Sequence, residues 1–99
     1  MTLSNILAEL LSKAQREGTA WARLPRGLIV IVTQAQGAWV IKIARDAPTR
    51  PSEYEENTVL SALGALFVGK WKRTTNVRGK RGRLYNISEV EFTPVFEEA

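Results

Sequence analysis

The 99-residue chain contains no cysteine and no histidine. Without cysteine it can form neither a disulfide framework nor a thiolate zinc site, and it has no thiol nucleophile. Because histidine and cysteine are the usual ligands of transition metals, a zinc, copper or haem site is not expected. Acid–base and nucleophilic roles would fall to other residue types, and no pair of these has a recognisable catalytic spacing. We therefore expect no enzyme activity, no catalytic residue, no metal and no cofactor.

The chain also lacks a long hydrophobic run. No apolar segment approaches the roughly 20 residues that a bilayer-spanning helix needs. Residues 1–15 have no basic stretch ahead of their apolar residues and include Glu9, so they do not resemble a secretory signal. We expect no membrane partner and a cytoplasmic location. The length fits one domain with one core, so residues 1–99 are predicted to form a single domain.

Acidic residues are absent from one basic segment. The net charge is +4, from 14 Lys and Arg against 10 Asp and Glu. Residues 70–85 carry seven of these cations and no acid, residues 1–69 are nearly neutral, and residues 86–99 carry only glutamates. A concentrated cationic patch is typical of phosphate binding, whereas scattered lysines mainly improve solubility.

Two helices are predicted from periodicity and capping. Apolar residues from Leu3 to Ala14 recur at helical spacing, which predicts a helix over about 3–16 that is capped by Thr2 or Ser4 and ended by Gly18. Ser52 and Glu55 match a capping box, so a second helix is expected to begin there and to stop near Gly64, or to run on to residue 67. The acids of its first turn favour the positive end of the helix dipole.

Four strands are predicted. The apolar, β-branched run 28–33 predicts a strand in the middle of a sheet with both faces buried, and residues 39–44 then alternate, so the two should form a hairpin. Trp39 is expected in or near the core, and Trp21 is expected to cover the sheet edge. Two further strands over about 66–75 and 83–92 form a second hairpin. A change of apolar parity within 83–92 suggests a β-bulge near Ser88.

These elements predict an α+β fold of order α-β-β-α-β-β. The expected architecture is an antiparallel sheet with two helices packed on one face and a protruding basic second hairpin over 66–92. Its tip, residues 76–83, holds most of the charge. The tail, residues 94–99, is expected to fray.

The basic hairpin is the predicted functional site. Arginines and lysines at its tip can reach DNA or RNA phosphates, and glycines let the backbone approach closely. Trp71 can stack on an unpaired base or anchor the hairpin to the core, and the anchor role is favoured. Arg23 and Arg26 would join the surface if the entry to the first strand lies near the hairpin. The predicted nucleic-acid-binding residues are Lys70, Trp71, Lys72, Arg73, Arg78, Gly79, Lys80, Arg81, Gly82 and Arg83.

Short glycine motifs in this region do not change that prediction. Residues 79–82 fit the GXXG pattern of KH domains, but that loop joins two helices, whereas the flanks here predict strands. Residues 64–70 fit the start of a P-loop, but a helix comes before them and Trp71 stands where magnesium binding needs a hydroxyl. Neither motif is assigned.

The sequence therefore predicts a small, non-enzymatic nucleic-acid-binding protein that contacts the phosphate backbone through its basic hairpin. One alternative is a protein-interaction module, such as an inhibitor or accessory protein, that docks on an acidic partner surface. Another is that the hairpin is only solvated and its cations protect an exposed sheet edge against aggregation. In a homodimer, Phe92, Val95 and Phe96 would bury against a second copy while the C-terminal acids pair with its hairpin. We favour these three side chains closing the molecule's own core.

Overall fold

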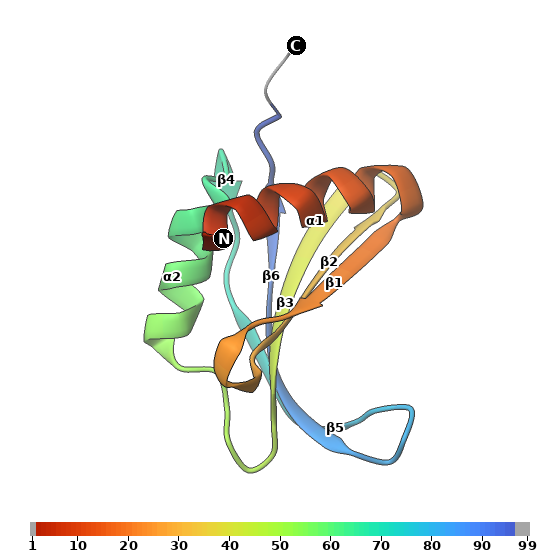
Figure 1. The fold of residues 1–99 in the computed structure, drawn as a ribbon, viewed down its shortest axis with the longest axis vertical. Coiled ribbons are helices and arrows are strands. Elements are labelled where there is room, and N and C mark those ends of the chain that lie inside the picture. Colours follow the sequence, from red (N-terminus) through yellow and green to blue (C-terminus); the bar gives the residue numbers. More distant parts are fainter. Residues whose placement is uncertain (1, 97–99) are drawn as a thin grey trace.

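The computed structural model describes residues 2–96, and Figure 1 shows their arrangement. Within that range lie two α-helices and a six-stranded antiparallel sheet. In chain order the elements are α1 (Leu3–Glu17), β1 (Thr19–Arg23), a one-turn 3-10 segment (Pro25–Gly27), β2 (Ile29–Ala35), β3 (Ala38–Asp46), α2 (Glu53–Leu63), β4 (Phe67–Val68), β5 (Lys72–Arg78) and β6 (Leu84–Thr93). The predicted α+β class and the predicted order are confirmed.

Both helices begin and end where the sequence predicts. The Thr2 side chain accepts a hydrogen bond from the backbone N–H of Asn5, and Gly18 ends α1 in the left-handed conformation. At α2 the Ser52 side chain accepts from the Glu55 N–H, and the Glu55 carboxylate accepts from the Ser52 N–H. Gly64 then ends α2, so the alternative of a longer helix that continues to residue 67 is excluded.

The sheet is covered by helices on one face. Its strand order is β1-β2-β3-β6-β4, and β5 pairs with β6 on the same side as β4. Directly opposed residues Ala20, Val32, Ile41 and Val90 form one buried row across four strands. Leucines of α1 and Val59 and Leu63 of α2 pack on this row, so the core lies between the helices and one sheet face.

The strands differ from the prediction in three respects. β1 was not predicted; it pairs along its length with β2 and forms one edge of the sheet. The prediction that residues 28–33 are buried on both faces is wrong, because Val30 and Val32 are buried whereas Ile29 and Ile31 are partly exposed. Helices cover only one side of β2. The single strand predicted over 66–75 is divided into β4 and β5, with residues 69–71 between them.

The β-bulge lies in β5, not near Ser88. Thr74 pairs with Ile87 and Val77 with Tyr85, so two residues of β5 face only Asn86. The polar residues Asn86 and Ser88 occupy buried positions on the core face of β6, which therefore alternates without a break. The apolar residues of 83–92 suggested a change from one strand face to the other because two core-face positions are occupied by polar side chains, those of Asn86 and Ser88.

Three loops meet at one end of the sheet. The turn after β1, the loop after β3 and the tip between β5 and β6 all lie at the lower end of the view in Figure 1. Arg45 Nη1 donates to the Arg26 carbonyl at 2.6 Å, and the Ala47 N–H donates to the Leu84 carbonyl at 3.0 Å. Arg26 therefore lies at the hairpin end of the molecule. Arg23 lies in the same row of the sheet as Thr74 of β5, but on the strand at the opposite edge, with β2, β3 and β6 between them.

Candidate nucleic-acid interface

The tip of the basic hairpin is a closed loop. The Gly79 N–H donates to the Arg83 carbonyl at 2.7 Å, and the Gly82 N–H donates to the Gly79 carbonyl at 3.1 Å. A Cβ atom at residue 79 would lie 2.7 Å from Cε2 of Tyr85, so only glycine lets the backbone pass over this ring. Gly82 has φ of +80°, which favours glycine. Both glycines thus have a structural role within the tip.

The tip cations are exposed, and most of them make no ion pair with residues 2–96. Arg78, Lys80 and Arg81 have no carboxylate within salt-bridge distance in that range. Arg83 Nη1 lies 3.5 Å from Asp46 Oδ2, and both side chains are more than half exposed, so this pair contributes little. These four cations are therefore available to an anionic ligand.

Arg73 forms a structural ion pair with Glu56 of α2. Its Nη2 lies 2.6 Å and its Nε 3.0 Å from the Glu56 carboxylate, which is only 1% exposed. Burial raises the pKa of Glu56, but hydrogen bonds from Arg73 and Ser88 and the Arg73 charge outweigh this effect, so the pKa lies below its ordinary value. The Glu56 bonds raise the Arg73 pKa. Glu56, explained from sequence by the helix dipole, has this second role.

The structure separates Lys70 and Trp71 from the tip. Lys70 precedes Arg78 by eight residues, which is roughly 25 Å along an extended strand. Trp71 is half-buried and packs against the core, which is the anchor position. Lys70 and Lys72 line a pocket together with Glu89 and Glu91, whose charges oppose theirs. The cations best placed for phosphate are those of the tip.

Arg50 was missed by sequence reasoning. It is exposed in the loop after β3 and lines a small depression together with Arg73, Thr74 and Thr75 of β5. No periodicity or motif signals it, because Arg50 precedes Arg73 by 23 positions in the chain. Arg26 also lies at this end, where its carbonyl is held by Arg45. The cationic surface therefore extends from the tip to a neighbouring loop.

Asn86 holds that loop against the hairpin. Its Nδ2 donates to the carbonyls of Pro48 at 3.2 Å and Thr49 at 2.9 Å, and its Oδ1 accepts from the Asn76 N–H at 2.9 Å. The last bond satisfies a backbone donor inside the bulge, where Asn76 has φ of +54°. One buried amide therefore connects the bulge of β5 with the loop that carries Arg50.

Glu55 connects the start of α2 with Arg45 of β3. Arg45 donates from Nε to both carboxylate oxygens of Glu55, at 3.0 and 3.1 Å, and also donates from Nη2 to Oε2. These hydrogen bonds are the main reason that the pKa of Glu55 lies below its ordinary value. Arg45 is thus committed to α2 and to the Arg26 carbonyl.

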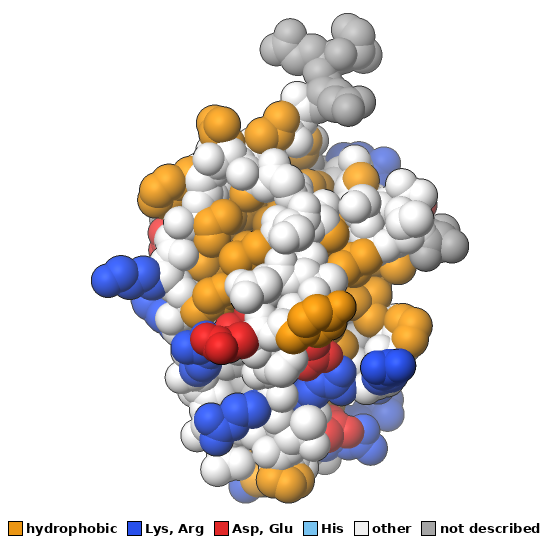
Figure 2. Space-filling model, turned by 90° about the vertical axis from the view of Figure 1, so that its left-hand side faces the viewer, with side chains coloured by type: hydrophobic (Ala, Val, Ile, Leu, Met, Phe, Trp, Pro, Cys, Tyr) orange, Lys and Arg blue, Asp and Glu red, His pale blue; other side chains and the backbone are white. Residues whose placement is uncertain are grey.

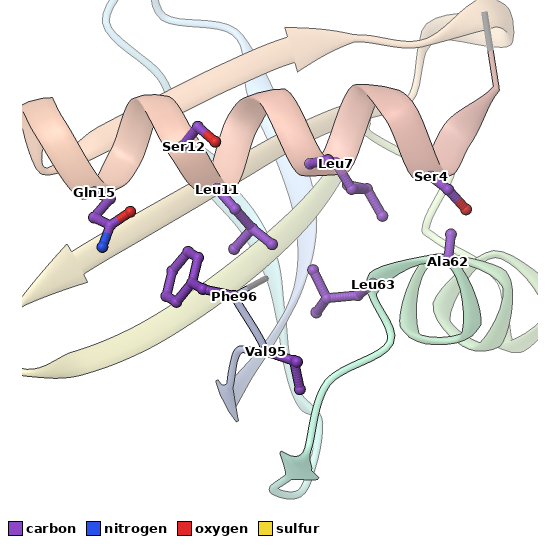
Figure 3. A pocket seen from close by; sticks show the side chains of 10 residues that line it. Ser4, Leu7, Leu11, Ser12, Gln15, Ala62, Leu63, Val95 and Phe96 are labelled. Atoms are coloured by element: carbon purple, nitrogen blue, oxygen red, sulfur yellow. The ribbon is translucent and has the colours of Figure 1, made fainter. Parts of the chain in front are cut away.

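The opposite end of the molecule is apolar. Leu66, Phe67, Val95 and Phe96 are exposed there, and the Phe96 ring lies 5.6 Å from the Trp39 ring. A groove of about 570 Å³ runs between α1, the end of α2 and residues 95–96, with Leu7, Leu11 and Leu63 on its floor (Figure 3). Phe92 is buried as predicted, but Val95 and Phe96 do not complete the core. Glu97 and Glu98, predicted to fray or to pair with another copy, lie outside the described residues.

The surface is consequently polar at one end and apolar at the other. Figure 2 shows one side of the molecule, on which hydrophobic side chains gather in the upper half and most visible Lys and Arg side chains lie in the lower half. Within residues 2–96, no three Asp or Glu side chains come together in a group suited to a metal ion. No helix in the described part of the chain is long and apolar enough to cross a membrane.

The chain matches no protein-family model, and neither the curated proteins nor the solved structures contain a significant match.

Proposed function

We propose that the protein binds nucleic acid through the loop end of its sheet, with the hairpin tip on the phosphate backbone. The observation that supports this most is the set of exposed tip cations without ion pairs among the described residues, set on a closed loop. Arg50 and Arg26 from neighbouring loops add charge at the same end. Such an interface derives its affinity mainly from counterion release and has little sequence preference.

Removing the tip charges should weaken binding. We expect Arg78, Lys80, Arg81 and Arg83, all changed to Ala, to lower the affinity for duplex DNA, single-stranded DNA and structured RNA. With duplex DNA, the slope of log affinity against log salt should fall by about 0.9 for each lost phosphate contact. Fluorescence anisotropy of labelled ligands at several salt concentrations measures both effects.

A matched pair of double variants controls for overall charge. Lys80→Ala with Arg81→Ala removes two cations from the tip, and Lys13→Ala with Arg16→Ala removes two exposed cations from α1. If the tip is the contact, the first pair reduces affinity by more than the second. Equal losses would mean that binding reflects net charge alone, and unchanged binding in the quadruple variant would contradict the proposal.

The apolar end favours a second candidate, a protein-interaction module or homodimer. Leu66, Phe67 and Val95 are all more than half exposed, and Val95 lines the groove of Figure 3. If this surface associates with a second copy, sedimentation velocity shows a dimer whose fraction rises with protein concentration, and Phe67→Ser shifts it to monomer. Glu9→Ser, at an exposed position of α1, is the control. A monomer at all concentrations contradicts self-association.

A further inference from the structure

Within residues 2–96, no helix packs on the second face of the sheet. Both helices pack on the face formed by Val32 and Ile41, and α1 lies in front of the sheet in Figure 1, so the other face is turned away from the viewer. On that open face the strand register places five residues in one row across the sheet. The row consists of Trp21, Ile31, Lys42, Glu89 and Lys72.

Trp21 is the most unusual member of this row. It lies on the edge strand β1 and is 63% exposed, so the expectation that it covers the sheet edge is wrong. Its neighbours Ala20 and Ala22 face the core, and Trp21 is not among the side chains that pack against that core. The indole therefore does not belong to the core, and its direct cross-strand neighbour on the open face is the partly exposed Ile31 of β2.

Charges on the open face favour an anionic ligand near Trp21. Arg23 lies two residues farther along β1 on the same face, and Lys42 is two strands away in the same row. Glu89 is opposed by Lys42 on one side and Lys72 on the other, so cations flank it within the row. Glu91 lies farther from the tip, beyond Glu89. The part of the face between Trp21 and the hairpin is therefore cationic and aliphatic.

We propose that the open face binds single-stranded nucleic acid, with one base stacked on Trp21 and the backbone passing Arg23 and Lys42. The inference rests on the proposed function and defines its ligand further. Single strands present unpaired bases, and aromatic side chains on a flat sheet stack against them without reading sequence. In a duplex the bases are stacked on one another and cannot reach the indole.

The open face is continuous with the basic hairpin. β5 and β6 contribute Thr74 and Ile87 to the next row, which also holds Arg23, Ile29 and Ala44. Four inter-strand spacings of about 4.8 Å separate β1 from β5, so Trp21 lies roughly 19 Å from Lys72 across the sheet. A single-stranded nucleic acid can therefore contact Trp21 and then the cations of the tip.

The test compares the affinity for single-stranded and duplex DNA among variants that keep or remove the aromatic ring at position 21. Anisotropy is measured with an oligothymidine single strand and with a duplex of equal length, for the wild type and for Trp21→Thr and Trp21→Phe. Threonine keeps a β-branched side chain on the edge strand but removes the ring, whereas phenylalanine keeps a stacking surface. Tyr54→Ser removes another exposed aromatic ring, which lies on α2, and is the control.

We expect Trp21→Thr to lower the single-strand affinity by about 5-fold to 150-fold, the usual loss for one stacked base, and to leave duplex affinity unchanged. Trp21→Phe should retain most of the affinity and lose the tryptophan fluorescence quenching that the single strand causes. Circular dichroism shows whether each variant is folded.

The two proposals can fail separately. If the hairpin variant loses affinity while Trp21→Thr binds the single strand like the wild type, the tip contact stands and the open-face inference is wrong. If the wild type binds neither ligand at low salt, the proposed function itself is wrong. If Trp21→Thr abolishes self-association instead of nucleic-acid binding, the open face is a protein interface and the inference is overturned.

Discussion

We expect Arg73→Ala to destabilise the protein more than Glu56→Gln, although Arg73 is the more exposed partner of the pair. Removing Arg73 leaves a buried carboxylate without its counterion, whereas neutralising Glu56 leaves a half-exposed guanidinium that water can solvate. An unpaired buried charge costs about 3–5 kcal/mol, and the cost for Glu56 should fall below that range, because water can enter where Arg73 was. Urea denaturation at pH 7 measures the difference.

The pH dependence of the free energy of unfolding shows whether the unpaired Glu56 carboxylate causes the loss of stability in Arg73→Ala. In the wild type the lowered pKa values of Glu55 and Glu56 add stability that is complete above the unfolded-state value of about 4.3 and is lost as pH falls through the folded-state values. In Arg73→Ala, burial raises the Glu56 pKa, so the variant gains stability relative to the wild type on acidification. Lys72→Ala, a neighbouring exposed cation without an ion pair in residues 2–96, is the control. An Arg73→Ala effect equal to that of Lys72→Ala would contradict the structural role.

Asn86 should be the second sensitive position. Asn86→Ala removes the acceptor of the Asn76 N–H and the donor to the carbonyls of Pro48 and Thr49 at a site that is 5% exposed. Buried polar groups that lose their partners cost about 1–3 kcal/mol each, and water can reach some of them here, so we expect a total loss of about 2–4 kcal/mol. Thermal and urea unfolding measure it.

Asn86→Asp makes this test more specific. Aspartate keeps an acceptor for the Asn76 N–H but directs an unprotonated oxygen at two carbonyls at pH 7. The variant should therefore be less stable at pH 7 than the wild type and should lose part of that difference near pH 3, where a protonated carboxyl can donate. Asn57→Ala, at an exposed position of α2, is the control and should change stability little. A similar effect at both asparagines would mean that the three hydrogen bonds are not what matters.

Local signals in the sequence were sufficient for both helices, because the caps at Thr2, Ser52 and Gly64 act over three or four residues. β1 was missed because its five residues include two alanines on the core side, so the strand carries no strong apolar alternation. The run 28–33 was assigned two buried faces from its composition, but whether a helix covers the second face depends on the rest of the chain.

The candidate site was predictable in composition and not in arrangement. The excess of cations over 70–85 is visible in the sequence. That Arg73 belongs to Glu56, that Trp71 packs on the core and that Arg50 lies beside β5 all depend on contacts between residues far apart in the chain. Trp21 was noticed, but its exposure follows from which face of β1 the helices leave uncovered.

The closed hairpin tip has a consequence for the entropy of binding. A flexible basic loop must give up backbone freedom when it settles on phosphates, and each residue ordered at that moment costs about 1–2 kcal/mol. Here the bond between Gly79 and Arg83 and the contact between Gly79 and Tyr85 already order the loop in the free protein. Most of the loss of backbone entropy therefore occurs during folding. Binding then restricts mainly the rotamers of the long tip side chains.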